Sequence, residues 1–150
     1  ARAAAEARMD RPAPRVALGL ALRGLAHGAI DVSAGLLGDI GHVMKASGVG
    51  AVIDAELAAT LLPCEPATIA ADGMAGAEVG LRAVLSGGDD YELAFSAPAS
   101  ARAAIAAAAD RVGLRVTRIG SLRAEPGLRL QDGRGQALDA SRFRSFDHFA

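Results

Sequence analysis

The chain has 150 residues, of which 51% are hydrophobic and 22% charged, a composition typical of a folded domain with a hydrophobic core. A net charge of -1 and an aromatic content of 3% exclude the basic, stacking surface of a nucleic-acid-binding protein. The sequence contains no apolar run long enough for a transmembrane helix, no signal peptide and only one cysteine, so we expect a cytoplasmic protein without membrane contact or disulfides.

The first part of the chain predicts two helices separated by a strand. Apolar residues at helical spacing predict a helix over residues 14–26. A strand-like run over residues 29–32 then stops at Ser33, which we expect to cap the next helix. That helix buries one face from Leu36 to Met44, and the pair Ser47-Gly48 ends it.

The rest of the chain alternates between strands and helices. The pattern predicts a strand over 49–54, a short helix or turn over 57–66, a helix near 69–84, a strand over 91–97, a helix over 98–112, a strand over 115–120 and a hairpin of residues 128–131 and 136–138. We find no repeat and no linker. The expected fold class is therefore α+β (mixed α/β), a mixed β-sheet covered by helices in one domain over residues 1–150.

An acidic motif occupies residues 86–93, which read SGGDDYEL. Asp89, Asp90 and Glu92 lie within four positions, directly after two glycines and between apolar runs that we expect to be buried strands over 83–85 and 93–95. Adjacent carboxylates repel each other, so a divalent cation or a cationic substrate would stabilise the loop. The alternative is a hairpin turn whose acidic side chains face water.

A second motif joins the strand at 29–32 to the helix that follows. Asp31 at the strand end is suited to hold a metal ion, and Ser33 with the first N–H groups of the helix is suited to a phosphate oxygen. Gly35, Gly38 and Gly41 recur three residues apart, which predicts that a ligand or another helix approaches closely. The alternative is a capped core helix that binds nothing.

Several common motifs are missing from the chain. It contains no Walker A loop, no nucleophile elbow, no paired histidines at zinc spacing and no dinucleotide-binding fingerprint. Cys64 and the three histidines need no chemical role, so we assign no catalytic side chain. If the protein handles nucleotide phosphates, it must use carboxylates, a metal ion and helix N-termini.

Four motifs together resemble the C-terminal half of thiamine-monophosphate kinase: DVSAGL at residues 31–36, KASGVG at 45–50, SGGDDYEL at 86–93 and FDHF at 146–149. The resemblance extends along nearly the whole chain. It implies membership of the ATP-using group that includes aminoimidazole ribonucleotide synthetase and selenophosphate synthetase, and a fold like the C-terminal domain of that synthetase. Such enzymes have two domains, so it also implies that the N-terminal domain is absent here and that the complete kinase is a homodimer.

The resemblance implies a kinase that transfers the γ-phosphoryl group of ATP to thiamine monophosphate, giving thiamine diphosphate, with Mg²⁺ as cofactor. By position, Asp31 matches a magnesium ligand, Ser33 an ATP contact and Glu92 a substrate contact. Phe146 matches an aromatic position that lies against thiamine. Asp89 and Asp90 are expected to support Glu92, the loop or the metal site.

One position departs from the family pattern. The family has a second metal-binding aspartate where this chain has Ala34, and a methyl group cannot coordinate a cation. Because of this change and, above all, the absence of the family's N-terminal half, we expect these 150 residues alone to be inactive. Two alternatives remain: another ATP-dependent enzyme of the same group, which Glu92 and the tail with Phe146 disfavour, and a non-catalytic domain, which Ala34 favours.

Overall fold

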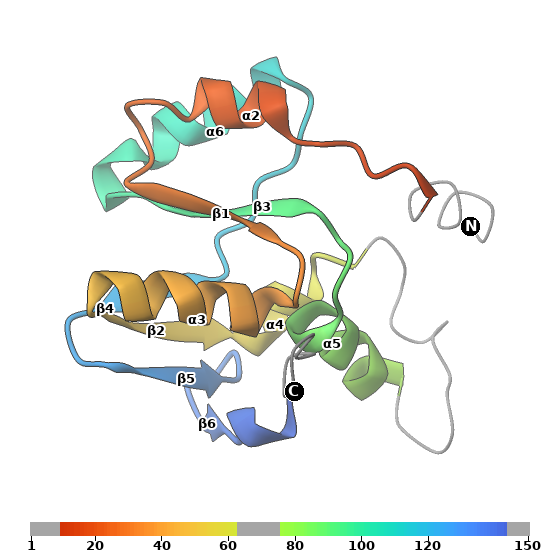
Figure 1. Ribbon diagram of the computed structural model, residues 1–150. Coiled ribbons are helices and arrows are strands. Elements are labelled where there is room, and N and C mark those ends of the chain that lie inside the picture. The colour runs from red at the N-terminus through yellow and green to blue at the C-terminus, as the bar shows by residue number, and fades with distance from the viewer. Residues whose placement is uncertain (1–9, 63–75, 144–150) are drawn as a thin grey trace. The chain divides into compact units, whose positions relative to one another are not determined.

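The computed structural model describes residues 10–62 and 76–143, and Phe146 and Cys64 lie outside them (Figure 1). The chain divides into two compact units. The first unit comprises Ala1–Ser33 and Asp89–Val116, and the second comprises Ala34–Gly88 and Thr117–Ala150. Each unit combines helices with strands, which confirms the α+β class. None of the helices in the described residues has the length and hydropathy needed to cross a membrane.

The first unit is a two-stranded ribbon with two helices. Its elements are α2 (Val16–Ala21), β1 (Gly28–Val32), β3 (Glu92–Ser96), the short 3-10 helix η2 (Ala99–Ala101) and α6 (Arg102–Arg111). Strand β1 pairs with β3 in antiparallel register, with Gly28 opposite Ser96 and Val32 opposite Glu92. The two helices lie side by side next to this ribbon (Figure 1).

A small apolar core joins the helices to the ribbon in the first unit. Leu18 and Leu22 of α2 are buried together with Ile105 of α6. Leu93 and Phe95 pack against them, and because strand residues alternate between faces, both come from the same face of β3. This contact stabilises the unit largely by removing apolar surface from water.

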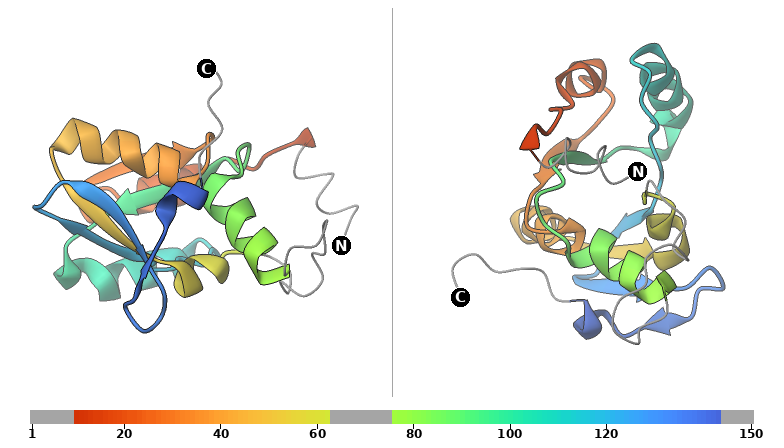
Figure 2. Two further views of the ribbon diagram at one scale, coloured as in Figure 1. Left: turned by 90° about the horizontal axis from the view of Figure 1, so that it is seen from below. Right: turned by 90° about the vertical axis from the view of Figure 1, so that its right-hand side faces the viewer.

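The second unit is built on a four-stranded mixed sheet in the order β4-β2-β5-β6. Its strands are β2 (Gly50–Asp54), β4 (Gly120–Arg123), β5 (Gly127–Gln131) and β6 (Ala137–Leu138). Its helices are α3 (Leu36–Ser47), α4 (Ala55–Ala59), α5 (Gly76–Ser86) and the 3-10 helix η3 (Ala140–Arg142). Strand β2 is parallel to β5 and antiparallel to β4, and α3 runs along the sheet (Figure 2).

Both the helices and the sheet of the second unit contribute buried apolar residues. Leu37 of α3, Ile53 of β2 and Leu130 of β5 are buried, and Leu85 of α5 has no exposed surface. Gly48 ends α3 in the left-handed conformation with φ of 65°, as the Ser47-Gly48 pair predicts. The hairpin around residues 132–133 is also confirmed, since β5 and β6 are antiparallel.

Three predicted elements differ from the structure. Helix α2 ends at Ala21, short of the predicted residue 26, and the chain turns there before Gly24, whose φ is 78°. Residues 83–85 belong to α5 and are not a strand, because three apolar residues in a row fit a buried helix as well as a buried strand. The strand expected over 115–120 begins only at Gly120, where it meets β2.

Candidate functional site

The β1–β3 ladder brings the two acidic motifs together at one end of the ribbon in the first unit. Asp31 lies opposite Leu93, and Val32 lies opposite Glu92. The pairing continues past the strands, because the N–H of Tyr91 donates to the carbonyl of Val32 at 2.8 Å and the N–H of Asp89 donates to the carbonyl of Ser33 at 2.9 Å. The two acidic motifs, which are far apart in the sequence, are thus joined by backbone hydrogen bonds.

The register also separates the side chains of this end. Residues directly opposite each other share a face of an antiparallel ribbon, so Asp31 shares one face with Leu93 and Glu92 shares the other with Val32. Asp31 is exposed and Val32 is buried. The two carboxylates are therefore neighbours along the ribbon that are suited to separate contacts rather than to one shared ligand.

The loop before β3 has an unusual backbone. Asp89 and Tyr91 have φ of 64° and 51°, and they are the two non-glycine residues with positive φ in the described part of the chain. This left-handed conformation is unfavourable for side chains with a Cβ, and least so for Asp and Asn. The hydrogen bonds to Ser33 and Val32 hold it in place. Such over-determined strain is common at binding sites.

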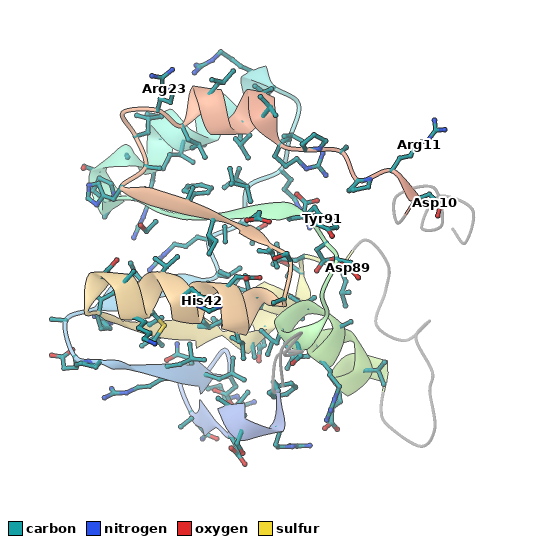
Figure 3. All side chains as sticks on the ribbon, in the orientation of Figure 1. Asp10, Arg11, Arg23, His42, Asp89 and Tyr91 are labelled. Carbon is teal, nitrogen blue, oxygen red and sulfur yellow. The ribbon has the colours of Figure 1, made fainter. Side chains whose placement is uncertain are left out.

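The side chains of the same loop interact with each other. The Tyr91 hydroxyl donates to Oδ1 of Asp89 at 3.2 Å, and both residues are exposed and close together where β3 begins (Figure 3). This hydrogen bond, followed by the negative charges of Asp89 and Asp31, raises the pKa of the Tyr91 phenol. The charge of Asp31 is thus felt at Tyr91 from the neighbouring strand.

Arg15 also belongs to this end of the ribbon, although no sequence motif pointed to it. Its Nε donates to Oε2 of Glu92 at 2.8 Å, and its Nη2 donates to Oε1 at 2.7 Å. The side chain of Arg15 is 19% exposed and that of Glu92 is 42% exposed. The hydrogen bond with Glu92 raises the pKa of Arg15. No short-range signal points to this pair, since the partners are 77 positions apart.

The start of α3, in the second unit, differs from the expectation for Ser33. Ser33 is not the helix cap, because Gly35 occupies that position with φ of 103° and there is no side-chain cap. A Cβ on Gly35 would lie 2.9 Å from the backbone of Ser86, so the expected close approach occurs here with a neighbouring helix. A Cβ on Gly41, by contrast, would meet nothing within 4 Å, so the close approach is not repeated at Gly41.

The N–H of Ala34 has an internal partner that the sequence pattern missed. It donates to Oδ2 of Asp39 at 3.0 Å, and Asp39 is the one charged side chain that is buried in the described residues. A buried carboxylate in the first turn of a helix is favoured by the dipole of that helix. The buried Asp39 thus supports the start of α3.

The carboxylates of the described residues do not form a preassembled metal cage. Residues 10–62 and 76–143 contain no cluster of three or more His, Cys, Asp or Glu side chains that could hold a metal ion. Mg²⁺ commonly binds through one or two carboxylates, water and substrate phosphates, and the exposed Asp31 and Asp89 fit that donor set. Asp90 is exposed in the same loop, and the prediction for Phe146 lies outside the described residues.

Comparison with known proteins identifies relatives over most of the chain. Residues 1–133 match the family "AIR synthase related protein, C-terminal domain". The chain is 42% identical over 142 residues to thiamine-monophosphate kinase of Escherichia coli, which covers 93% of this chain and 41% of that protein. The chain thus spans about two fifths of the length of the curated relatives it matches.

Solved structures give the same result. The crystal structure of thiamine-monophosphate kinase from Stenotrophomonas maltophilia matches with a TM-score of 0.68 and 42% identity, over 85% of this chain and 37% of that one. AaThiL, complexed with AMPPCP and TMP, matches with a TM-score of 0.63 and 24% identity over 95% of this chain and 40% of that one, which shows a shared fold. These matches confirm the resemblance to the C-terminal half of the kinases, and the chain belongs to the AIR synthase related family as a C-terminal domain.

Proposed function

We propose that the chain is the C-terminal half of a kinase that transfers the γ-phosphoryl group of ATP to thiamine monophosphate, giving thiamine diphosphate. The observation that carries this proposal is the 42% identity to thiamine-monophosphate kinase across 93% of the chain. The AMPPCP and TMP of AaThiL, which has the same fold, agree with such a substrate pair. We further propose that the complete protein is a cytoplasmic homodimer with an N-terminal domain.

The proposed roles of individual residues come from the family resemblance, and all of them except Phe146 lie near one end of the β1–β3 ribbon. Asp31 is the proposed Mg²⁺ ligand, and Ser33, two residues later, is the proposed ATP contact. Glu92 is the proposed contact for the cationic ring system of thiamine, and Asp89 and Asp90 support the loop or the metal site. Phe146 is the proposed aromatic contact for thiamine, because a cation is attracted to the face of an aromatic ring.

Charge explains why the reaction needs these groups. Two phosphates that repel each other must meet in line, so positioning and charge neutralisation supply most of the rate. Bound Mg²⁺ would neutralise the phosphate oxygens. Asp31 and Glu92 lie on different faces of the ribbon, which supports separate contacts for the metal and for thiamine.

The test is a coupled assay of ADP release. We compare the 150-residue chain with a hybrid in which this chain, carrying Ala34→Asp, replaces the matching segment of the Escherichia coli relative. The chain alone should release no ADP with thiamine monophosphate, and the hybrid should release it. Turnover by the chain alone would contradict our proposal that these residues are inactive by themselves. A hybrid that folds and binds Mg²⁺-ATP but does not phosphorylate thiamine monophosphate would favour another ATP-dependent enzyme of the group. A folded hybrid that binds no Mg²⁺-ATP would favour a non-catalytic domain.

A further inference from the structure

The geometry of Arg15 is more specific than that of an ordinary surface ion pair. Its guanidinium contacts both oxygens of Glu92, at 2.7 and 2.8 Å, in the two-pronged arrangement that fixes the plane of a carboxylate. Arg15 is the more buried partner, at 19% exposed against 42% for Glu92. Glu92 is therefore held from the protein side, and much of its surface remains open to a ligand.

Arg15 itself is well placed to act as a fixed support. It follows Pro14, whose ring restricts the backbone, and it is the last residue before α2. Its side chain makes no capping hydrogen bond to α2 and is directed to Glu92 instead. Leu18, one turn further on, is anchored in the core with Ile105. The base of the arginine is thus fixed by packing that does not depend on Glu92.

The Arg15–Glu92 ion pair is expected to contribute little to the stability of the fold. Partly exposed ion pairs contribute about 0–1 kcal/mol to folding. A bidentate contact does, however, limit the carboxylate to one orientation, which lowers the entropy that a ligand would otherwise lose on binding. We infer that Arg15 is a positioning residue that orients Glu92 toward the cationic ring of thiamine monophosphate, an inference that rests on the proposed function.

The test uses the active hybrid with Ala34→Asp and measures both substrates. Arg15→Met should raise the KM for thiamine monophosphate about tenfold, the loss expected for a charged hydrogen bond, while kcat and the KM for ATP change less than about twofold. Arg15→Lys should recover only part of the loss, because an ammonium group cannot form the two-pronged contact. Arg23→Met is the control, since Arg23 is exposed near the other end of α2 (Figure 3).

A double-mutant cycle separates this role from a general structural one. In a Glu92→Gln background, Arg15→Met should raise the KM for thiamine monophosphate less than about twofold further, because Arg15 acts through Glu92. A full tenfold rise in that background, or an equal rise in the KM for ATP, would overturn the inference and leave the proposed function intact. A folded hybrid without activity or thiamine monophosphate binding would instead overturn the proposed function and the inference together.

Discussion

At the scale of single residues, backbone and side-chain hydrogen bonds fix the conformation of the loop before β3. Asp89 and Tyr91 both adopt positive φ, at a cost of roughly 1–2 kcal/mol for each residue. Their N–H groups are held by the carbonyls of Ser33 and Val32, and their side chains are joined by a hydrogen bond. The loop is therefore shaped before any ligand arrives, and the Asp89 side chain already has a partner in Tyr91.

The hydrogen bond between Tyr91 and Asp89 can be followed directly, because the chain has one tyrosine and no tryptophan. Asp89→Asn keeps a residue that tolerates positive φ but removes the negative charge, so the raised pKa of Tyr91 should fall toward its ordinary value of 10.0. Absorbance of the phenolate during an alkaline titration measures this change. Asp31→Asn should lower the pKa less, because Asp31 is the smaller cause of the shift. An equal or larger effect of Asp31→Asn would contradict the observed contact.

The same pair predicts a pH dependence of stability. The phenol of Tyr91 has a raised pKa in the folded chain, so its contribution is fully present below the unfolded value of 10.0 and is lost as the pH rises through the folded value. The free energy of unfolding should therefore fall above about pH 10 less steeply for Tyr91→Phe than for the natural chain. Urea denaturation at several alkaline pH values checks this difference. Identical slopes for the two proteins would contradict it.

At the scale of elements, the start of α3 depends on a glycine that no other residue can replace easily. Gly35 has φ of 103°, and an added Cβ would lie 2.9 to 3.0 Å from the backbone of Ser86 at the end of α5. The two helices can meet here only because that Cβ is missing. The glycine pattern in the sequence correctly predicted a close neighbour, although the neighbour is a helix of the same unit.

Gly35→Ala should therefore lower the free energy of unfolding by about 2–4 kcal/mol, through unfavourable φ and the clash with Ser86. Gly41→Ala is the matched control, because Gly41 lies inside α3 with open space beside it. It should stabilise the chain by about 0.5–1 kcal/mol, the usual difference between alanine and glycine in a helix. Urea denaturation of both variants measures the difference, and similar effects of the two would contradict this packing.

Asp39 supports the same helix start from inside. Because its buried carboxylate accepts from the N–H of Ala34, Asp39→Ala should lower the free energy of unfolding by about 1–3 kcal/mol. Asp39→Asn retains an acceptor oxygen of similar shape and should lose less. Thermal and urea denaturation check the order of the two variants. If the two variants lost the same free energy of unfolding, the acceptor oxygen that Asp39→Asn retains would not contribute to stability, which would contradict the role of the hydrogen bond.

The sequence predicted those features that depend on local pattern. The strand before Ser33, the left-handed end of α3 at Gly48 and the alanine-rich α6 followed from periodicity and capping residues. The cap at Ser33 was wrong because Gly35 packs against Ser86, a contact with a distant segment. The Arg15–Glu92 pair and the register of β1 on β3 could not be predicted either, since both depend on tertiary contacts.

At the scale of the whole molecule, the chain divides into two units, and the proposed ligand-binding residues that the structure describes, Asp31, Ser33 and Glu92, belong to the first. Ala34 is the first residue of the second. The resemblance implies an aspartate at this position in the family. The N–H of Ala34 is bonded to Asp39 within the second unit.

Restoring that aspartate tests whether the chain retains the frame of a metal site. Ala34→Asp adds a second carboxylate three residues after Asp31 and should tighten Mg²⁺ binding about tenfold or more in calorimetry with Mg²⁺-ATP. The N–H of residue 34 is a backbone group, so its hydrogen bond to Asp39 should survive the change. The double variant Asp31→Asn, Ala34→Asp is the control and should lose the gain. Failure of Ala34→Asp to bind Mg²⁺-ATP would show that this alanine is not the one missing part, and would favour a domain that has no catalytic metal.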